Sequence, residues 1–290
     1  MDELVTVKEE QKNTVKITKC LNCETEFEGN FCPHCGQKAD TGRFTVRFIF
    51  QNFILGILSN DGGVWFTLKN LFTRPGQMMI DIINGKRKSY FSPFPMLFLT
   101  LSLYVLIFTF TGSRADEFAS IDYKPDNVSE TVADDKVSSA IVVKNHMSSI
   151  IDYGGKIYRD YYTTIMVLTI PLYILMARWC YGKKNRKRYN WGEYCIPVVY
   201  ATILVYIYSC VVSICYVISD ELYDVVDAWS FVFTIIAYSM CFKKMLEFSV
   251  AKTVWRTVLL HVAYFAVVFV VLVSVLLLFV FVYSIKTLKA

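Results

Sequence analysis

The chain has 290 residues, a formal net charge of +5 and a hydrophobic share of 54%. This share exceeds the roughly 45–50% of an ordinary soluble domain, and it falls into runs long enough to cross a bilayer. The composition therefore favours an all-α polytopic membrane protein over a soluble domain. The modest positive charge suits loops that face anionic lipid and gives no reason to expect nucleic acid as a partner.

Residues 1–19 are polar and mixed in charge, without the apolar core of a signal peptide, and this predicts a flexible arm on the cytoplasmic side. Residues 20–38 follow the pattern C-x2-C-x8-C-x2-C, formed by Cys20, Cys23, Cys32 and Cys35. Two such pairs can offer four thiolates to one tetrahedral ion, which is the closed site that zinc prefers. We predict a zinc-ribbon-like module with structural Zn²⁺, whose folding is driven by the metal.

Two other uses of these four thiols stay open, namely an iron site with four sulfur ligands and a redox pair. The sequence CPHC at 32–35 is also the active-site pattern of disulfide oxidants, but such a pair needs a thioredoxin-like domain around it. The short polar stretch before Cys20 leaves no room for that domain. His34 is expected to be a bystander. The remaining cysteines are expected to be small buried apolar residues: Cys180, Cys195, Cys210, Cys215 and Cys241.

Residues 44–90 predict a set of short amphipathic helices at the membrane interface, joined to the module by a linker at 39–43. The first, at 44–58, is too short to span a bilayer, and it lies either in the interface or against the bundle. A second short helix is expected at 64–72 and a third at 77–84. The turn signal TRPG at 73–76 separates these two helices, and Gly85 ends the third.

Residues 91–290 predict a transmembrane bundle of about five spans. The expected spans lie near 91–111, 160–180, 194–218, 228–242 and 257–284, with an extracytoplasmic loop at 112–156. Lys and Arg concentrate before the first span, between the second and third, and between the fourth and fifth, whereas residues 219–227 are acidic. This pattern predicts a cytoplasmic N-terminus and a C-terminus outside. If the short fourth span is re-entrant, the C-terminus moves inside.

The four-cysteine motif, the RPG turn at 74–76 and the segment GKRKSYFSP at 85–93 together resemble a bacterial membrane protein family, domain-of-unknown-function family 3667. The resemblance extends over about residues 20–105 and implies a bacterial inner-membrane protein, but it supplies no activity. The residues that match the family pattern are Cys20, Cys23, Cys32, Cys35, Arg74, Pro75, Gly76, Gly85, Lys86, Arg87, Lys88, Tyr90 and Pro93.

No catalytic motif is present: the sequence lacks HExxH, GxSxG, P-loop and GxGxxG patterns, and the protein is not expected to be an enzyme. Within the spans, His261 is expected to form hydrogen bonds between helices or at the interface. Two basic clusters either contact lipid head groups or only set the topology. Their residues are Arg74, Lys86, Arg87 and Lys88 in the first, and Lys183, Lys184, Arg186, Lys187 and Arg188 in the second.

These features favour a scaffold or interaction module at the membrane, in which the cysteine module docks a protein partner or braces the interfacial helices. One alternative is a transporter or lipid-handling protein, with a water-filled cavity lined by Tyr206, Tyr208 or His261. A further alternative is a thiol redox sensor. Membrane lipids are expected partners, and the sequence leaves the oligomeric state open.

Overall fold

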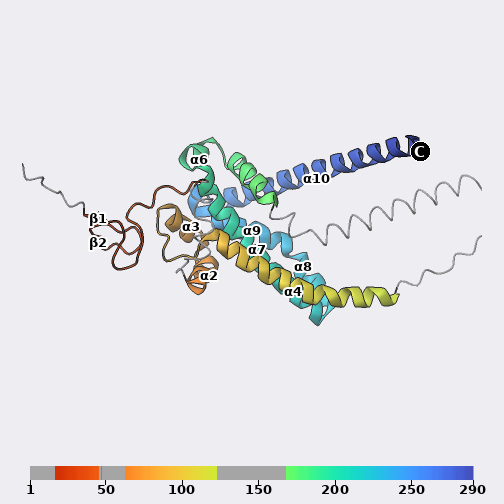
Figure 1. The fold of residues 1–290 in the computed structure, drawn as a ribbon, viewed down its shortest axis with the longest axis horizontal. Helices are drawn as coiled ribbons and strands as arrows, with labels where there is room; N and C mark the ends of the chain where they lie inside the picture. The colour runs from red at the N-terminus through yellow and green to blue at the C-terminus, as the bar shows by residue number, and fades with distance from the viewer. Residues whose placement is uncertain (1–16, 46, 48–62, 123–167, 290) are drawn as a thin grey trace, which may run out of the picture.

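The computed structural model describes residues 17–45, 47, 63–122 and 168–289, with side chains up to Thr111 and, apart from 272 and 276, up to Leu277 (Figure 1). The described part is mostly helical. Its one sheet pairs β1 (Thr18–Lys19) with β2 (Glu26–Phe27) in antiparallel register, Thr18 opposite Phe27. This small sheet belongs to the cysteine module, which lies beyond one end of the helical bundle.

Two short helices, α2 (Val64–Thr73) and α3 (Pro75–Ile83), lie between the cysteine module and the bundle. Pro75 occupies the first turn of α3, where its missing N–H is not needed. A Cβ on Gly76 would lie 3.1 Å from the carbonyl oxygen of Met240, so this glycine lets α3 approach α9 closely. The predicted helix at 44–58 falls almost wholly outside the described residues.

The bundle begins with α4 (Pro93–Asp122) and the helix Leu168–Cys180, followed by α6 (Lys183–Arg188) and α7 (Trp191–Ile218). It continues with α8 (Asp220–Ala228), α9 (Ser230–Leu246) and α10 (Val250–Lys289). Three stretches are long and apolar enough to cross a membrane: Pro93–Thr111, Trp191–Ile218 and Val250–Val275. The pair α8–α9, bent by 41°, makes up to four. Of the predicted second span, only Leu168–Cys180 lies within the described residues.

Contacts between helices give their relative directions. Tyr194 of α7 lies beside Phe242, and Tyr208 lies beside Phe233, with ring centroids 6.4 and 4.3 Å apart, so α7 and α9 are antiparallel. Arg256 donates to the Cys180 carbonyl, and Tyr264 donates to Thr169, so α10 runs antiparallel to the helix Leu168–Cys180. The α4–α7 pair is parallel, because Tyr200 donates to the Phe91 carbonyl while Tyr206 packs on Tyr104.

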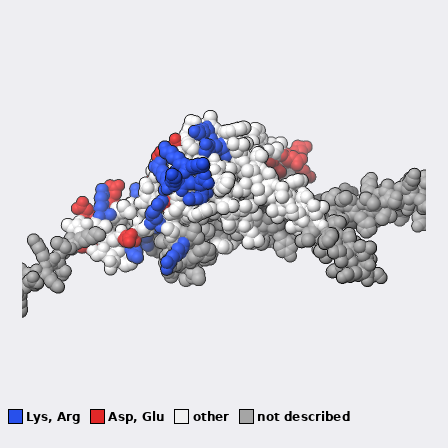
Figure 2. All heavy atoms as spheres, turned by 90° about the horizontal axis from the view of Figure 1, so that it is seen from above, with Lys and Arg blue, Asp and Glu red and all other residues white. Residues whose placement is uncertain are grey.

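These directions bring the basic connectors to one end of the bundle. The segments at 85–88, 183–188 and 243–256 all lie at the end that faces the cysteine module, and the acidic α8 lies at the other end. Figure 2 shows the same separation, with Lys and Arg gathered toward the module and a patch of Asp and Glu far from it. The helix order and the charge distribution therefore agree with each other.

Candidate metal centre

The cysteine module is built from two hairpin turns with the same hydrogen-bond pattern. In the first, the Cys20 N–H donates to the Thr25 carbonyl at 2.9 Å, and the Glu24 N–H donates to the Cys20 carbonyl at 3.0 Å. In the second, the Cys32 N–H donates to the Gln37 carbonyl, and the Gly36 N–H donates to the Cys32 carbonyl, both at 2.8 Å. Each turn therefore presents two sulfurs on one side.

Both turns need a left-handed residue just after their second cysteine. Gly36 has φ 72° and Glu24 has φ 64°. Glycine adopts this conformation without steric cost, whereas a residue with a Cβ adopts it at a cost of about 1–2 kcal/mol. The sequence indicates the second turn through Gly36, but the glutamate at the equivalent place in the first turn hides the repeat.

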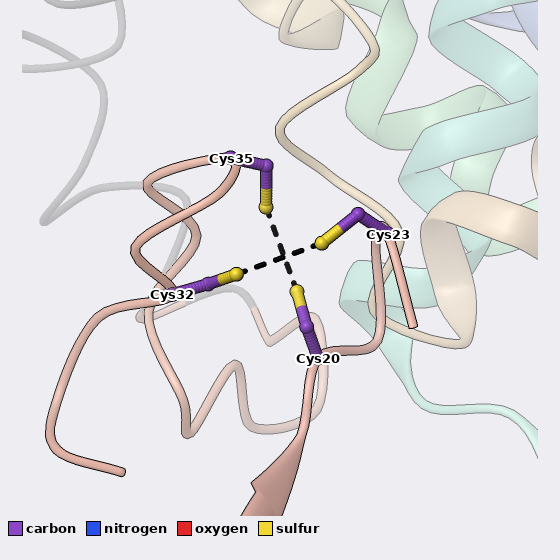
Figure 3. Close-up of side chains that lie close together, drawn as sticks. All are labelled: Cys20, Cys23, Cys32 and Cys35. Carbon is purple, nitrogen blue, oxygen red and sulfur yellow. Dashed lines mark hydrogen bonds between the residues drawn. The ribbon is translucent and has the colours of Figure 1, made fainter. Parts of the chain in front are cut away.

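The four sulfurs converge on one point (Figure 3). They all lie within 4.8 Å of one another, and the separations Cys20–Cys35 and Cys23–Cys32 are both 3.5 Å. A tetrahedral ion with metal–sulfur bonds of about 2.3 Å places its ligand sulfurs about 3.8 Å apart. Both of these 3.5 Å pairs join different hairpins, which suits one shared ion. The donor set therefore fits a metal ion that prefers thiolates.

The surroundings of the sulfurs differ. Hydrogen bonding with the Thr25 side chain and backbone lowers the pKa of Cys23 to about 5. Burial raises the pKa of Cys35 to about 12. A bound cation stabilises the ionised form of every coordinating thiol, so it offsets the burial at Cys35.

Two amide side chains attach the module to residues 85–89, which we call the GKRKS loop. Gln37, with 5% of its surface exposed, donates from Nε2 to the Gly85 carbonyl at 2.9 Å. Its Oε1 accepts from the Arg87 and Lys88 N–H groups, both at 3.1 Å. Asn22 Oδ1 accepts from the N–H and hydroxyl of Ser89 at 3.2 and 3.0 Å. Both hairpins of the module therefore contact the same loop.

The chain that leaves the module, residues 41–45, passes between the GKRKS loop and the start of α7, and we call it the strap. On one side, the Arg87 guanidinium donates to the carbonyls of Thr41 at 2.6 Å and Gly42 at 2.8 Å and lies over the Phe44 ring. Burial lowers the pKa of Arg87. The two carbonyl oxygens accept hydrogen bonds from its guanidinium and so compensate for part of the lost contact with water. Arg87 therefore acts as a structural anchor for the strap.

On the other side of the strap, Arg43 binds the Glu193 carboxylate with two hydrogen bonds, at 2.9 and 2.7 Å. Glu193 is nearly fully buried, and Asn190 completes a capping box with it at the N-terminus of α7. A Cβ on Gly192 would lie only 2.4 Å from the Phe44 carbonyl oxygen, so the strap rests directly on the backbone of α7.

The predicted basic residues divide into two groups in space. Lys86, Arg87 and Lys88 lie in the GKRKS loop beneath the module, while Arg74 contacts Asn70 between α2 and α3. The second cluster forms α6, which is positioned by Arg178 through hydrogen bonds to the Arg186 and Tyr189 carbonyls. Its members are Lys183, Lys184, Arg186, Lys187 and Arg188. Head-group contact by either group stays a prediction.

The three side chains expected to line a transport cavity have different contacts. His261 is buried against the Tyr173 hydroxyl and the Thr257 carbonyl. Tyr208 donates to the Val226 carbonyl of α8, and the Tyr206 ring packs on Tyr104 at 5.4 Å. Within the described part of the chain, no hydrogen bond or ring contact joins these three residues to one another.

Sequence reasoning missed the residues that fasten the module: Asn22, Gln37, Arg43 and Glu193. Only Glu193 carried a readable signal, because N-x-x-E before an apolar run is a helix-capping pattern.

The segment that receives the module is also the segment that matches a known family. Residues 61–105 match the model of a family described as "Protein of unknown function (DUF3667)". The match covers α2, α3, the GKRKS loop and the first part of α4, and it confirms the resemblance there. Neither the comparison with curated proteins nor that with solved structures gives a match.

Proposed function

We propose that this chain is a non-enzymatic bacterial inner-membrane protein in which a cytoplasmic structural zinc site braces the membrane bundle and docks a protein partner. One observation carries the proposal: the cysteine module is fastened both to the GKRKS loop and, through Arg43 and Glu193, to the start of α7. The module therefore links the loop before α4 to the start of α7, two parts of the chain that are far apart in the sequence.

A structural role for the metal is supported by the ligand set and by the module's small core. Four cysteine ligands fill a tetrahedral shell, which leaves no open position for a substrate. The buried apolar cluster of the module consists of Cys20, Phe27 and Cys32 alone among the described residues. Such a core cannot hold the hairpins together, so metal binding supplies the free energy of folding.

The proposed topology has five crossings, an inside N-terminus and an outside C-terminus. It is supported by the alternating helix directions and by the basic connectors at the module end. In this orientation, α6 presents lysines and arginines to the head groups of the inner leaflet. Ile17 and Phe31, 64% and 63% exposed, offer apolar contacts on the module for a protein partner.

The proposal is tested by metal content per chain and thiol titration before and after chelation, on protein purified in mild detergent. One zinc per chain and four thiols released by chelation are expected. A Cys20→Ser/Cys23→Ser variant should lose the zinc, unfold at lower temperature and lose copurifying partners, whereas a Cys180→Ser/Cys210→Ser control keeps all three properties. Identical stability and partners in wild type and Cys20→Ser/Cys23→Ser would contradict both bracing and docking.

A transporter or lipid-handling role is the second candidate, and the 41° bend between α8 and α9 favours it, because broken helices surround many transport sites. A cysteine in place of Tyr206 should then react with a membrane-impermeant maleimide, and protection from the reagent would count against a cavity. A thiol redox sensor instead requires metal-free protein in which Cys32 and Cys35 oxidise reversibly.

A further inference from the structure

The GKRKS loop directs several hydrogen-bond donors at acceptors that come from elsewhere in the chain. The backbone N–H groups of Arg87 and Lys88 both point at one oxygen, Gln37 Oε1. The next N–H, that of Ser89, and the Ser89 hydroxyl share a second oxygen, Asn22 Oδ1. Four donors from three consecutive residues thus converge on two oxygens of the cysteine module.

This arrangement has the chemistry of an anion site. Successive backbone N–H groups aimed at one oxygen form a concavity that binds anions. Lys86, Arg87 and Lys88 add positive charge around it, and Gly85, at φ 100°, makes the turn that starts the loop. The two amide oxygens now bound are neutral, and a phosphate oxygen in their place would make charge-assisted hydrogen bonds, which are roughly twice as strong.

We propose that the GKRKS loop is a binding site for a phosphate group, and that the metal-bound cysteine module covers it. Gln37 and Asn22 place their side-chain oxygens where phosphate oxygens would bind. The loop leads directly into α4, which begins at Pro93, so it lies within reach of a phospholipid head group as well as of free phosphate. This inference rests on the proposed function, because the metal keeps the covering module folded.

Covering and binding exclude each other for two reasons. The amide oxygens and the phosphate compete for the same N–H groups, and the strap carbonyls hold the Arg87 guanidinium as long as the module is docked. Loss of the metal unfolds the module and releases both sets of donors. By linkage, phosphate must weaken metal binding by the same factor as metal weakens phosphate binding.

The test uses the full-length protein in detergent and measures dissociation constants, by titration calorimetry, for inorganic phosphate and for short-chain phosphatidylglycerol. An Asn22→Ala/Gln37→Ala variant removes the covering oxygens and leaves all four cysteines in place. Chelation of the wild type is expected to tighten the binding of at least one ligand tenfold or more. The Asn22→Ala/Gln37→Ala variant is expected to show the same increase in affinity without chelation. Addition of Lys86→Gln, Lys88→Gln and Ser89→Ala should abolish the gain.

The matched control is Lys243→Gln/Lys252→Gln, which alters two exposed lysines outside the loop and outside α6, removes the same two charges and should leave the gain intact. Gain for both ligands identifies free phosphate as sufficient, and gain for the lipid alone identifies the head group. The site is overturned if neither chelation nor the Asn22→Ala/Gln37→Ala substitution tightens binding of either ligand. It is also overturned if the tighter binding persists after the loop substitutions. Zinc content, measured on the same samples, separates failure of the metal proposal from failure of the phosphate site.

Discussion

The absence of a side chain at Gly192 lets the strap approach the bundle closely. At Gly192, an added Cβ would meet the Phe44 carbonyl oxygen at 2.4 Å and the Thr45 backbone at 2.7 Å. Backbone atoms cannot rotate away as a side chain does, so Gly192→Ala must push the strap off α7. We expect a destabilisation at or above the upper end of the about 1–3 kcal/mol seen for overpacking. A lower temperature of thermal unfolding in detergent measures it.

Gly63→Ala is the matched control for this substitution. Its Cβ would have its nearest neighbour at 3.5 Å, in ordinary contact with Phe66, and its φ of −63° suits any residue. Loss of glycine at this helix cap costs at most about 1 kcal/mol. Equal unfolding temperatures for the two variants would show that the strap does not rest on α7.

The four clustered cysteines were predictable as one site because their spacing in the sequence carries the geometry of two paired turns. The anchors were not, because each depends on residues brought together from far apart. Gln37 meets Gly85 across 48 positions and Arg43 meets Glu193 across 150, and no local pattern links them. A basic run such as GKRKS is expected at the cytoplasmic end of a span. Because the same run is expected with or without a covering module, it gives no sign that a module packs on it.

Among the helices, α2 is joined to the segment just before α4 by a hydrogen bond to a buried hydroxyl. The Phe91 N–H donates to the hydroxyl of Thr67 at 2.7 Å, and Thr67 has no exposed surface. Thr67→Val keeps the shape and leaves that N–H without its acceptor, which costs about 1–3 kcal/mol. We expect a lower unfolding temperature together with faster proteolysis within α2.

Thr73→Val in the same helix is the control, because the Thr73 hydroxyl is exposed and donates only to the Lys69 carbonyl of α2 itself. It should leave both measurements within error of wild type. If Thr67→Val and Thr73→Val behave alike, α2 is held by apolar packing rather than by this hydrogen bond.

The existence of most helices followed from apolar run lengths and from proline and glycine positions. Pro93 opens α4 close to the predicted start of the first span near 91. Pro75, by contrast, opens α3 two residues before the predicted start at 77, because the proline assigned to the turn occupies the first helical turn. The shape of the predicted fourth span could not be derived from hydropathy alone. The acidic residues 220–228 form α8, and the chain bends by 41° before α9, because α8 is amphipathic and polar whereas α9 packs along α7. Hydropathy alone does not report such a bend.

At the scale of the whole bundle, the separation of basic and acidic ends predicts an orientation in the membrane. Lys184→Cys lies on α6 and Asp224→Cys lies on α8, at opposite ends of the bundle, and both replace exposed side chains. In cells whose inner membrane is intact and directly accessible to the reagent, an impermeant maleimide should label Asp224→Cys. It should label Lys184→Cys only after that membrane is permeabilised. The parental chain, with its native cysteines, gives the background. Labelling of Lys184→Cys but not of Asp224→Cys in intact membranes would show the opposite orientation.

The contact between Arg43 and Glu193 also has a consequence for the order of assembly. The module is synthesised first, but the carboxylate that anchors its strap is made 150 residues later, after α4 and the helix Leu168–Cys180. At about 5–20 residues per second, the ribosome needs about 8–30 s to reach it. The cysteine module therefore has time to fold before its anchor exists and docks onto the bundle only after α7 begins, so a docked strap marks a chain in which α4 and the helix Leu168–Cys180 have already been synthesised.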